Sequence, residues 1–577
     1  MRAFNQYLLV DSTQPENAYG RFAEQILLAE GFMGFTQVDL AEAPLPEWQP
    51  RDLLLVTRCL LRRAQLETIL QAAARGLCAV FLQPQQLLVE LLGFTPASRV
   101  VHPGYVGAPD TASHGGLPLQ THLPIPCYHP PRGDGDWQAI AGAFDADGQD
   151  AGYPAVTAGR VGQGAVALFF YDLAEAVARI RFGNPDLGGY VTNGHWPWPH
   201  AFDLFAGHLD ERVAHLPQAD LHAQLLASVL TDVAPYPLAR LWYYEDAEYR
   251  TVGIFESDGD NSTPEQFRAL AAALEERNAA GTFYLMKDTR LTENDVRSLR
   301  ARGHAFAPHV APCESEEELY FAMPAAVRED TDLFRRRFGA ASPTLQCHYA
   351  PWPGYMNVLT AYLENGYRLS FAYMPSPLLW AKWLCGSGRP LKFFDRHGIL
   401  HDCWQQPLLA YDDLSVVPFL RDDADQARAA VDAAIDAAID HHHTAVPILS
   451  HPVSFCTYSS PVIEHCLDRL REAGAPIYSG DQWLQLVDRR AAVRVTQGHD
   501  DAGGLVCEVS CLQGRISVMV PAQRLQSSPS RLTVNGEAGH GCLRSRFGKQ
   551  WRCVQLDSEK HGGEVHIAIA GPVPRPA

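Results

Sequence analysis

Acidic side chains follow an apolar run in the middle of the chain, where they could bind a metal ion or move a proton. Glu256, Asp258 and Asp260 come directly after the run 251–255, with the hydroxyl of Ser257 among them. Such a run is typical of a buried strand, and parallel α/β folds place their ligands at the carboxyl ends of strands. The cluster therefore predicts a functional site. The alternative is a solvated loop that caps the helix expected after it.

Histidines follow two other apolar runs of the same region. His304, His309 and Cys313 lie within one short stretch, and His451 comes just after the apolar run 446–449. Imidazole, thiolate and carboxylate groups are ligands that divalent transition metals take in proteins. A carboxylate, a histidine pair and a distant histidine, each just past a strand, therefore predict a metal ion beside a proton donor.

The order and spacing of these residues resemble the polysaccharide deacetylase superfamily, carbohydrate esterase family four, whose domain is an irregular (β/α) barrel. The family opens with T-F-D-D-G, and the matching stretch here is 255–259, Phe-Glu-Ser-Asp-Gly. A helix that begins at Thr-Pro and a G-T-F-Y strand follow it, as in the family. The resemblance makes Asp258 a metal ligand. It also puts Ser257 where the family has its catalytic base, so either Asp260 or Glu256 supplies the base, or the chemistry has changed or been lost.

The family's second motif, H-[ST]-x-x-H-P, supplies the histidine ligands of its metal. By this register His309 matches the first ligand and Cys313 the second, and a cysteine thiolate binds zinc well. Cys313 is alternatively a small buried residue. His304, which matches a histidine that is not a ligand, could be recruited in its place. The implied cofactor is a divalent metal ion, with zinc expected.

The family's third motif, R-x-P-[YW], lines the substrate groove with an aromatic residue. The matching stretch keeps Pro351 and Trp352 but lacks the Arg. Trp352 is therefore expected either to stack on a sugar ring or to pack in the core. Tyr349 and His348 stand beside it as further substrate contacts, and His348 could also point toward the metal.

The family's closing Leu-x-His matches Leu449-Ser450-His451 without change. In the family this histidine protonates the leaving group, and the resemblance implies that role for His451. Asp402, next to Trp404, is a candidate to orient the imidazole.

The resemblance implies a metal-dependent hydrolase that removes an acyl group, expected to be N-acetyl, from an amino sugar or a related amide. Its metal ion would lower the pKa of a bound water toward about 7, and its partner is a carbohydrate or amide small molecule. Two alternatives stay open: a hydrolase of another non-peptide C–N bond, and an inactive carbohydrate-binding or scaffolding protein. The inactive alternative is motivated by Ser257, Cys313 and the missing Arg.

These motifs need elements that bring distant residues together. The stretch 249–489 alternates apolar runs with helical patterns, as a (β/α) barrel does. Residues 1–215 alternate in the same way and resemble the class I glutamine amidotransferase-like, flavodoxin-type α/β domains. Cys78 lies inside its expected strand and not at a strand-to-helix elbow, so a non-catalytic accessory role is expected. The stretch 95–155, rich in Pro, Gly and His, is expected to be loops or an insertion.

The remaining parts are a connection and a C-terminal unit. Residues 216–248 show a helical pattern ended by Pro235 and Pro237, as a helical linker would. Residues 490–577 are short apolar runs separated by turn residues, including Asn535-Gly536, which predicts a small β-sandwich. The predicted fold is α/β: an irregular (β/α) barrel, preceded by a flavodoxin-like parallel α/β domain and followed by a β-sandwich.

A run of three histidines, 441–443, looks like a metal-binding tract. It ends an Ala-rich helical pattern, where cations interact favourably with the helix dipole. A surface cluster at a helix C-terminus is therefore expected.

Composition excludes several classes of partner. The chain has 577 residues, with 47 Lys and Arg against 66 Asp and Glu, and a formal net charge of −19. Neither nucleic acid nor an anionic membrane surface attracts such a charge. No apolar stretch reaches the roughly 18–20 residues of a membrane span, the N-terminus lacks the zones of a signal peptide, and the 13 scattered cysteines form no C-x-x-C pair. We therefore expect reduced thiols, a cytoplasmic location, and neither a nucleic-acid nor a membrane partner.

Overall fold

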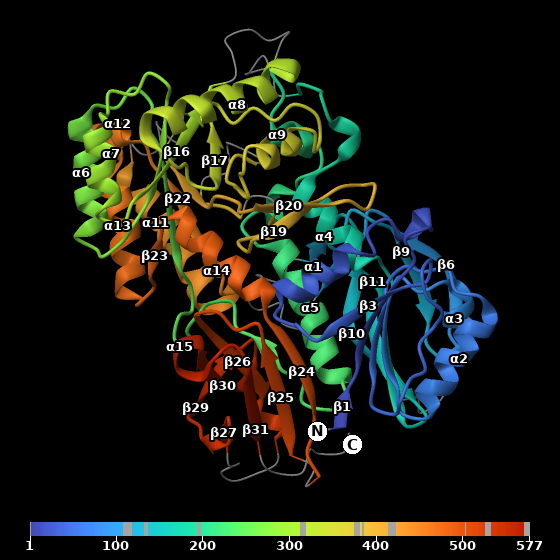
Figure 1. Ribbon diagram of the computed structural model, residues 1–577. Coiled ribbons are helices and arrows are strands. Elements are labelled where there is room, and N and C mark those ends of the chain that lie inside the picture. The colour runs from blue at the N-terminus through green and yellow to red at the C-terminus, as the bar shows by residue number, and fades with distance from the viewer. Residues whose placement is uncertain are drawn as a thin grey trace.

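The computed structural model consists of three packed units, shown in Figure 1. The described residues are 2–107, 118–131, 137–192, 198–311, 319–373, 381–383, 386–412, 423–501, 504–525 and 532–569. A barrel-like unit, green to orange, lies above two red C-terminal sheets, and the blue N-terminal unit lies beside them. Among the described residues, no helix is long and apolar enough to cross a bilayer.

The N-terminal unit is built on a nine-stranded sheet in the order β3-β2-β4-β5-β12-β11-β10-β7-β8. The parallel strands are β2 (Gln6–Val10), β3 (Phe35–Asp39), β4 (Leu53–Val56), β5 (Cys78–Leu82) and β12 (Gly164–Phe169). The helices are α1 (Phe22–Ala29), α2 (Arg63–Ala74), α3 (Gln86–Leu91), α4 (Leu173–Phe182) and α5 (Gln218–Val233). Counted along the chain, the parallel strands lie in the order 2-1-3-4-5, which doubly wound sheets use.

The described part of 95–155 contains six strands, so the prediction of loops is wrong, whereas an insertion between the paired strands β5 and β12 is not contradicted. The strands are β6 (Thr95–Val101), β7 (Tyr105–Gly107), β8 (Leu119–Gln120), β9 (Ile125–His129), β10 (Gln138–Phe144) and β11 (Asp150–Val161). Strand β10 shows why the pattern was missed, because its fully buried positions are Ala141 and Ala143. A strand is recognised in a sequence when large apolar residues alternate with polar ones, and alanines at the buried positions make this alternation too weak to see.

The barrel-like unit carries a ten-stranded, curled and open sheet in the order β19-β20-β18-β17-β16-β15-β14-β22-β21, with β23 paired to β14. The strands are β14 (Gly253–Asp258), β15 (Thr282–Leu285), β16 (Ala305–Val310), β17 (Thr344–Cys347), β18 (Leu369–Ser370), β19 (Leu391–Phe394), β20 (Leu400–Gln405), β21 (Ala410–Tyr411), β22 (Val446–Leu449) and β23 (Ile477–Tyr478). All pairs except β19 with β20 are parallel. Their carboxyl ends therefore gather at one edge of the sheet.

Helices cover the outside of this sheet. They are α6 (Pro264–Glu275), α7 (Glu293–Arg300), α8 (Leu319–Phe338), α9 (Val358–Glu364), α11 (Ala424–Ala437), α12 (Pro452–Ser454), α13 (Ser460–Glu472) and α14 (Gly480–Ala492). Helix α6 begins as predicted, because Thr263 caps it in a capping box and Pro264 occupies its first turn. The predicted α/β class is confirmed, with a half-open barrel as its central sheet.

Two antiparallel sheets make up the C-terminal unit, in the orders β1-β24-β25-β31-β27-β28 and β13-β26-β30-β29. Their C-terminal elements are β24 (Arg494–His499), β25 (Leu505–Ser510), β26 (Arg515–Pro521), β27 (Leu532–Val534), β28 (Glu537–Ala538), β29 (Gly541–Arg546), β30 (Lys549–Asp557), β31 (Val565–Ile569) and helix α15 (Ser558–His561). Two further strands come from elsewhere: β1 (Arg2–Phe4) pairs with β24, and β13 (Arg240–Leu241) pairs with β26. The chain start and the connection thus complete this unit.

A buried carboxylate ties the three units together. Glu30, at the end of α1, accepts hydrogen bonds from the Arg240 guanidinium at 2.8 Å and from the Tyr243 hydroxyl at 2.9 Å. It also pairs with Arg389, which lies two residues before β19. All of these side chains are buried. A single carboxylate therefore neutralises guanidinium groups from the connection and from the barrel.

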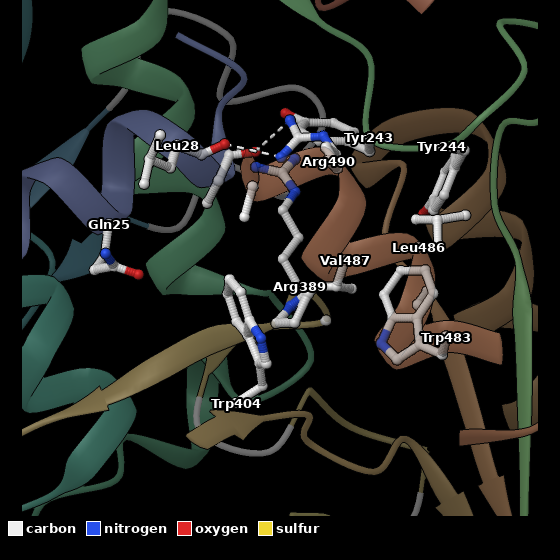
Figure 2. Close-up of a pocket in the computed structure, with 15 residues that line it drawn as sticks. Gln25, Leu28, Tyr243, Tyr244, Arg389, Trp404, Trp483, Leu486, Val487 and Arg490 are labelled. Carbon is white, nitrogen blue, oxygen red and sulfur yellow. Dashed lines mark hydrogen bonds between the residues drawn. The ribbon is translucent and has the colours of Figure 1, made fainter. Parts of the chain in front are cut away.

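A cavity of about 40 Å³ lies beside this junction and is shown in Figure 2. Arg490 of α14 reaches across it and donates hydrogen bonds to the carbonyls of Leu28 at 2.8 Å and Ala29 at 3.0 Å. Burial lowers the pKa of the Arg490 guanidinium to about 10. A cavity of this size holds at most a few water molecules, so this place serves packing between units.

The histidine run 441–443 is only partly at the surface, which corrects the prediction. His441 is exposed, whereas His442 and His443 are buried. The chain turns at His443, with a φ of 52°, just before β22. The imidazole ring of His443 lies 5.3 Å from the ring of Trp242, measured between centroids. Burial lowers the pKa of His443 to about 3, so its imidazole is neutral.

Candidate metal centre

Strand β14 carries the first acidic side chain to the open edge of the barrel. Successive side chains alternate along a strand, so Asp258 and Ser257 face opposite sides of the sheet. Gly259 then turns the chain, and its N–H donates to the Tyr284 carbonyl at 2.9 Å. A Cβ at Gly259 would lie 2.7 Å from that same carbonyl oxygen. Only glycine permits this turn, which brings Asp260 back beside Asp258.

His309 of β16 has both of its ring nitrogens placed by neighbours. Nδ1 lies 3.1 Å from the carbonyl oxygen of Gln346, which can only accept, so Nδ1 carries a hydrogen. Nε2 lies 3.2 Å from Asp260 Oδ1 and 3.7 Å from Asp258 Oδ2. A backbone carbonyl that fixes one ring nitrogen and turns the other toward carboxylates is typical of metal-binding imidazoles.

His348 joins this group from the end of β17. Its backbone N–H donates to the Val310 carbonyl at 2.9 Å, which extends the ladder between β16 and β17. Its Nδ1 lies 3.0 Å from Asp260 Oδ2. The ligand atoms of Asp260, His309 and His348 all lie within 4.8 Å of one another. Among the described residues, this is the one group of three or more His, Cys, Asp or Glu side chains that lies close enough to hold a metal ion.

Burial and charge act against each other in this cluster. Burial alone would raise the pKa of Asp260, but hydrogen bonds from His309 and His348 hold it well below its usual range. Burial raises the pKa of Asp258, although the nearby imidazoles of His309 and His451 oppose this effect. Burial lowers the pKa of His309, yet the two carboxylates outweigh it and the pKa is raised. The carboxylates of Asp258 and Asp260 and the imidazole of His309 thus interact strongly with one another in a buried site.

The donor set fits a divalent metal ion. Asp258 Oδ1 is buried and has no hydrogen-bond partner among the described residues, and an orphaned buried carboxylate oxygen is costly. One carboxylate and two imidazoles are ligands that suit zinc and other divalent transition metals. Asp260, His309 and His348 would hold the ion, with Asp258 against it.

A third histidine at the same edge is oriented by a carboxylate. His451, just after β22, has its Nδ1 2.8 Å from Asp412 Oδ1, and its backbone N–H donates to the same carboxylate. The hydroxyls of Ser450 and Ser459 donate to Asp412 Oδ2 at 2.6 and 2.7 Å. The Asp412 carboxylate therefore holds a hydrogen on Nδ1 and leaves Nε2 of His451 as the atom that exchanges protons.

Asp402 does not orient His451, so that candidate is wrong. Its side chain is 60% exposed and pairs with Lys392. The orienting residue is Asp412, which the sequence pattern did not reveal because β21 is only two residues long. The register offers the missing signal: Tyr411 pairs with Leu449, so the residues after these two strand ends lie side by side.

Glu256 lies deeper in the barrel than the metal-binding cluster. It is fully buried, and its Oε2 accepts the hydroxyl of Tyr284, which lies 2.9 Å from Thr344 Oγ1. Burial raises the pKa of Glu256 well above its usual value. The structure thus places this predicted base in a hydrogen-bond network of the core and does not bring it to the cluster.

Trp352 is fully buried, as the core alternative predicts, and its ring has no exposed face on which a sugar could stack. Its ring stacks on Phe393 at 5.5 Å and meets the edge of Tyr373 at 4.7 Å. Its indole N–H donates to the Tyr355 carbonyl. The Pro-Trp pair of the sequence does not distinguish the core from the substrate groove, because a large aromatic side chain suits both locations.

Replacing Trp352 by alanine is expected to act on stability. Removing a fully buried indole costs about 3–5 kcal/mol, whereas Tyr349→Ala, with a side chain that is 49% exposed, is expected to cost less than about 1 kcal/mol. Urea unfolding of both variants checks this. An unchanged unfolding free energy with weaker substrate binding would return Trp352 to the substrate site.

Two aromatic rings lie at the outer side of the cluster. The ring of Tyr349 lies 3.9 Å from that of His348, and Trp198 of the N-terminal unit lies 5.8 Å from Tyr349, measured between ring centroids. Tyr349 was predicted as a substrate contact. Trp198 was missed, because no local pattern links a residue of the first unit to a motif of the second.

Two further candidate ligands remain. Cys313 lies outside the described residues. His304 lies at the start of β16, at the opposite end from His309, where its ring nitrogens lie 3.1 Å from Glu275 Oε1 and 3.2 Å from the Gly281 nitrogen. Recruitment of His304 to the cluster is therefore wrong, and the second imidazole comes from His348.

Comparisons with known proteins give distant structural likeness. No protein-family model and no curated protein matches the chain. A protein from Mycobacterium smegmatis assigned as a polysaccharide deacetylase superposes with a TM-score of 0.32 at 15% identity, over 42% of this chain and 91% of that one. The chitin deacetylase of the fungal pathogen Colletotrichum lindemuthianum gives 0.28 at 13% identity, over 41% and 91%. A mutant of a CE4 family pseudoenzyme gives 0.26 at 11% identity, over 45% and 73%.

Proposed function

We propose that the protein is a metal-dependent hydrolase that removes an acyl group, in the simplest case N-acetyl, from an amino sugar or a related amide. The observation that carries the proposal is the gathering of Asp260, His309 and His348 within 4.8 Å. A second carboxylate and an oriented histidine lie at the same edge of the barrel. Metal ligands, a base and an acid around one point are what hydrolysis of an amide requires.

A divalent ion, when bound, supplies a Lewis acid and lowers the pKa of a water molecule toward about 7. Asp258 is the proposed base. Its Oδ1 is buried without a partner among the described residues and accepts a proton from the attacking water. The acyl C–N bond then breaks, which gives a carboxylate and an amine.

His451 is the proposed acid. Its Nε2 delivers a proton to the departing nitrogen, while Asp412 holds the hydrogen on Nδ1 and supports the charge of the ring. Asp412 is itself held by the hydroxyls of Ser450 and Ser459, so the imidazole is oriented before substrate arrives.

This assignment exchanges the roles that the resemblance implies for Asp258 and Asp260. Asp260 lies between two imidazoles, whereas Asp258 contacts one. His348 takes the place of a ligand and not of a substrate contact. Ser257 is buried on the opposite face of β14 and takes no part.

The test is release of acetate from N-acetyl compounds. The protein, loaded with Zn²⁺ or Co²⁺, is incubated with N-acetylglucosamine, its β-1,4-linked disaccharide and N-acetylethanolamine, and acetate and free amine are followed by NMR. Equal amounts of acetate and amine support the proposal. A protein that binds the ion and releases neither from any N-acyl compound would contradict it.

Replacing Asp412 by asparagine is expected to lower kcat by about 10²–10⁴-fold, because the amide no longer fixes the tautomer and charge of His451. Metal content should not change, because Asp412 contacts none of the proposed ligands. Steady-state kinetics and metal analysis on the same sample check this. Ser459→Ala removes one hydrogen bond to Asp412 and serves as the milder control. A kcat equal to that of the wild type would remove His451 from the mechanism.

A further inference from the structure

Among the described residues, the segment 198–200 of the N-terminal unit reaches the edge of the metal-binding cluster. His200 forms an isolated antiparallel bridge with Pro351. The Trp352 N–H donates to the Pro199 carbonyl at 2.8 Å. These backbone contacts join two units that are far apart in the sequence, directly behind the loop that carries His348.

His200 fixes this loop from the other side. Its Nε2 lies 2.9 Å from the Tyr349 carbonyl oxygen, and its Nδ1 lies 3.0 Å from the Trp198 carbonyl oxygen. The ring is buried and stacks on Phe202 at 4.5 Å. Both carbonyls can only accept, so the neutral ring donates its single N–H to one of them and packs against the other. The buried ring thereby works as a spacer between the two units.

The loop that His200 holds has an unusual backbone. Tyr349 and Ala350 have φ values of 61° and 47°, in the left-handed region that side chains with a Cβ disfavour. Consecutive residues of this kind persist only where the surroundings hold them, and they concentrate at functional sites. Here they follow directly after His348, and His200 contacts the first of them through the Tyr349 carbonyl.

The same segment adds an aromatic surface to the site. Trp198 is half-buried and Tyr349 is exposed, with ring centroids 5.8 Å apart and planes inclined at 46°. The Tyr349 ring also touches that of His348 at 3.9 Å. Exposed faces of two aromatic rings attract the apolar C–H face of a sugar ring, and aromatic side chains with a few polar groups typify small-molecule sites.

We propose that Trp198 and Tyr349 form a ring-binding subsite shared by the two units, and that His200 is the positioning residue that aligns His348 beside it. The proposal rests on the proposed function for the reaction that this subsite serves. The ligand class is a pyranose, the ring that carries the acyl group or the ring next to it. The N-terminal unit thus supplies a wall of the active site.

The first test compares a ligand that has a ring with one that lacks it. In Trp198→Ala, KM for the N-acetylglucosamine disaccharide is expected to rise about 10-fold with little change in kcat, whereas N-acetylethanolamine hydrolysis is expected to be unaffected. Trp198→Phe should recover most of the loss. Trp48→Ala removes a half-buried Trp elsewhere in the same unit and is the matched control. Equal effects of Trp198→Ala on both substrates, or none on either, would overturn the subsite.

The second test measures positioning without turnover. Calorimetric titration with Zn²⁺ is expected to show 10–100-fold weaker binding in His200→Ala, the range seen when a supporting partner of a ligand is removed. In His200→Gln, whose amide can still donate to the Tyr349 carbonyl, binding should be restored. Unchanged Zn²⁺ affinity in His200→Ala would overturn the positioning role.

Binding measurements separate this inference from the proposed function. Calorimetric titration of the Zn²⁺-loaded wild type and Trp198→Ala with the disaccharide reports the subsite even if no acetate is released. A wild type that binds the disaccharide through Trp198 but hydrolyses no amide would contradict the proposed function alone. A wild type that hydrolyses the disaccharide equally well without Trp198 would contradict the subsite alone.

Discussion

Asp260→Asn is expected to lose the metal ion, whereas Asp258→Asn is expected to keep it and lose activity. Asp260 offers its two carboxylate oxygens to His309 at 3.2 Å and to His348 at 3.0 Å, so it occupies the centre of the donor set. An amide there weakens metal binding by at least about 10²-fold, as loss of a ligand should exceed loss of its supporting partner. Asp258→Asn removes the proposed base and is expected to lower kcat by about 10²–10⁴-fold.

The two variants are read out together by metal analysis after dialysis and by acetate release. Asp402→Asn provides the control, because Asp402 is exposed and paired with Lys392, and it should match the wild type in both measurements. Metal retained in Asp260→Asn and lost in Asp258→Asn would restore the assignment that the sequence resemblance implies. Loss of the metal in neither variant would place the ion elsewhere.

Glu30→Ala is expected to destabilise the whole protein by about 3–5 kcal/mol. The substitution leaves Arg240 and Arg389 buried without their shared carboxylate. A buried charge without a partner destabilises the folded state by more than the ion pair stabilised it. Urea unfolding followed by tryptophan fluorescence measures the loss. Because the junction joins all three units, the transition should move as a whole.

A surface pair gives the matched control for this prediction. Glu42 has a side chain that is 75% exposed and lies 3.9 Å from Arg21, so Glu42→Ala is expected to cost less than about 1 kcal/mol. If Glu30→Ala lay as close to the wild type as Glu42→Ala, the junction would not hold the units together. Glu30→Gln, which keeps the shape and removes the charge, should fall between them.

Much of the candidate site is predictable from the sequence, because its residues follow long apolar strands. Asp258 and His451 each come at the end of a buried strand, and the paired ends of β14 and β22 bring them to one edge. Asp260, His309 and His348 are also predictable, because each follows or ends a strand of the same sheet. Their roles are not predictable from the sequence, because the distances that distinguish a metal ligand from a base depend on the folded structure.

The missed residues share a physical reason. Asp412 follows a strand of two residues, which is too short to leave a hydrophobic period. Trp198 belongs to another unit, and its contact with Tyr349 depends on how the units dock. Strand β1 pairs within the C-terminal unit, far away in the sequence. Each case depends on long-range packing that local patterns do not encode.

The most direct test of the metal centre is an anomalous diffraction measurement at the zinc edge on crystals of the full chain grown with Zn²⁺. An anomalous peak is expected within bonding distance of an Asp260 carboxylate oxygen, His309 Nε2 and His348 Nδ1, at about 2.0–2.2 Å from each. A map with no peak among these three side chains, in a protein that binds Zn²⁺ in solution, would contradict the metal centre on which the proposed function depends.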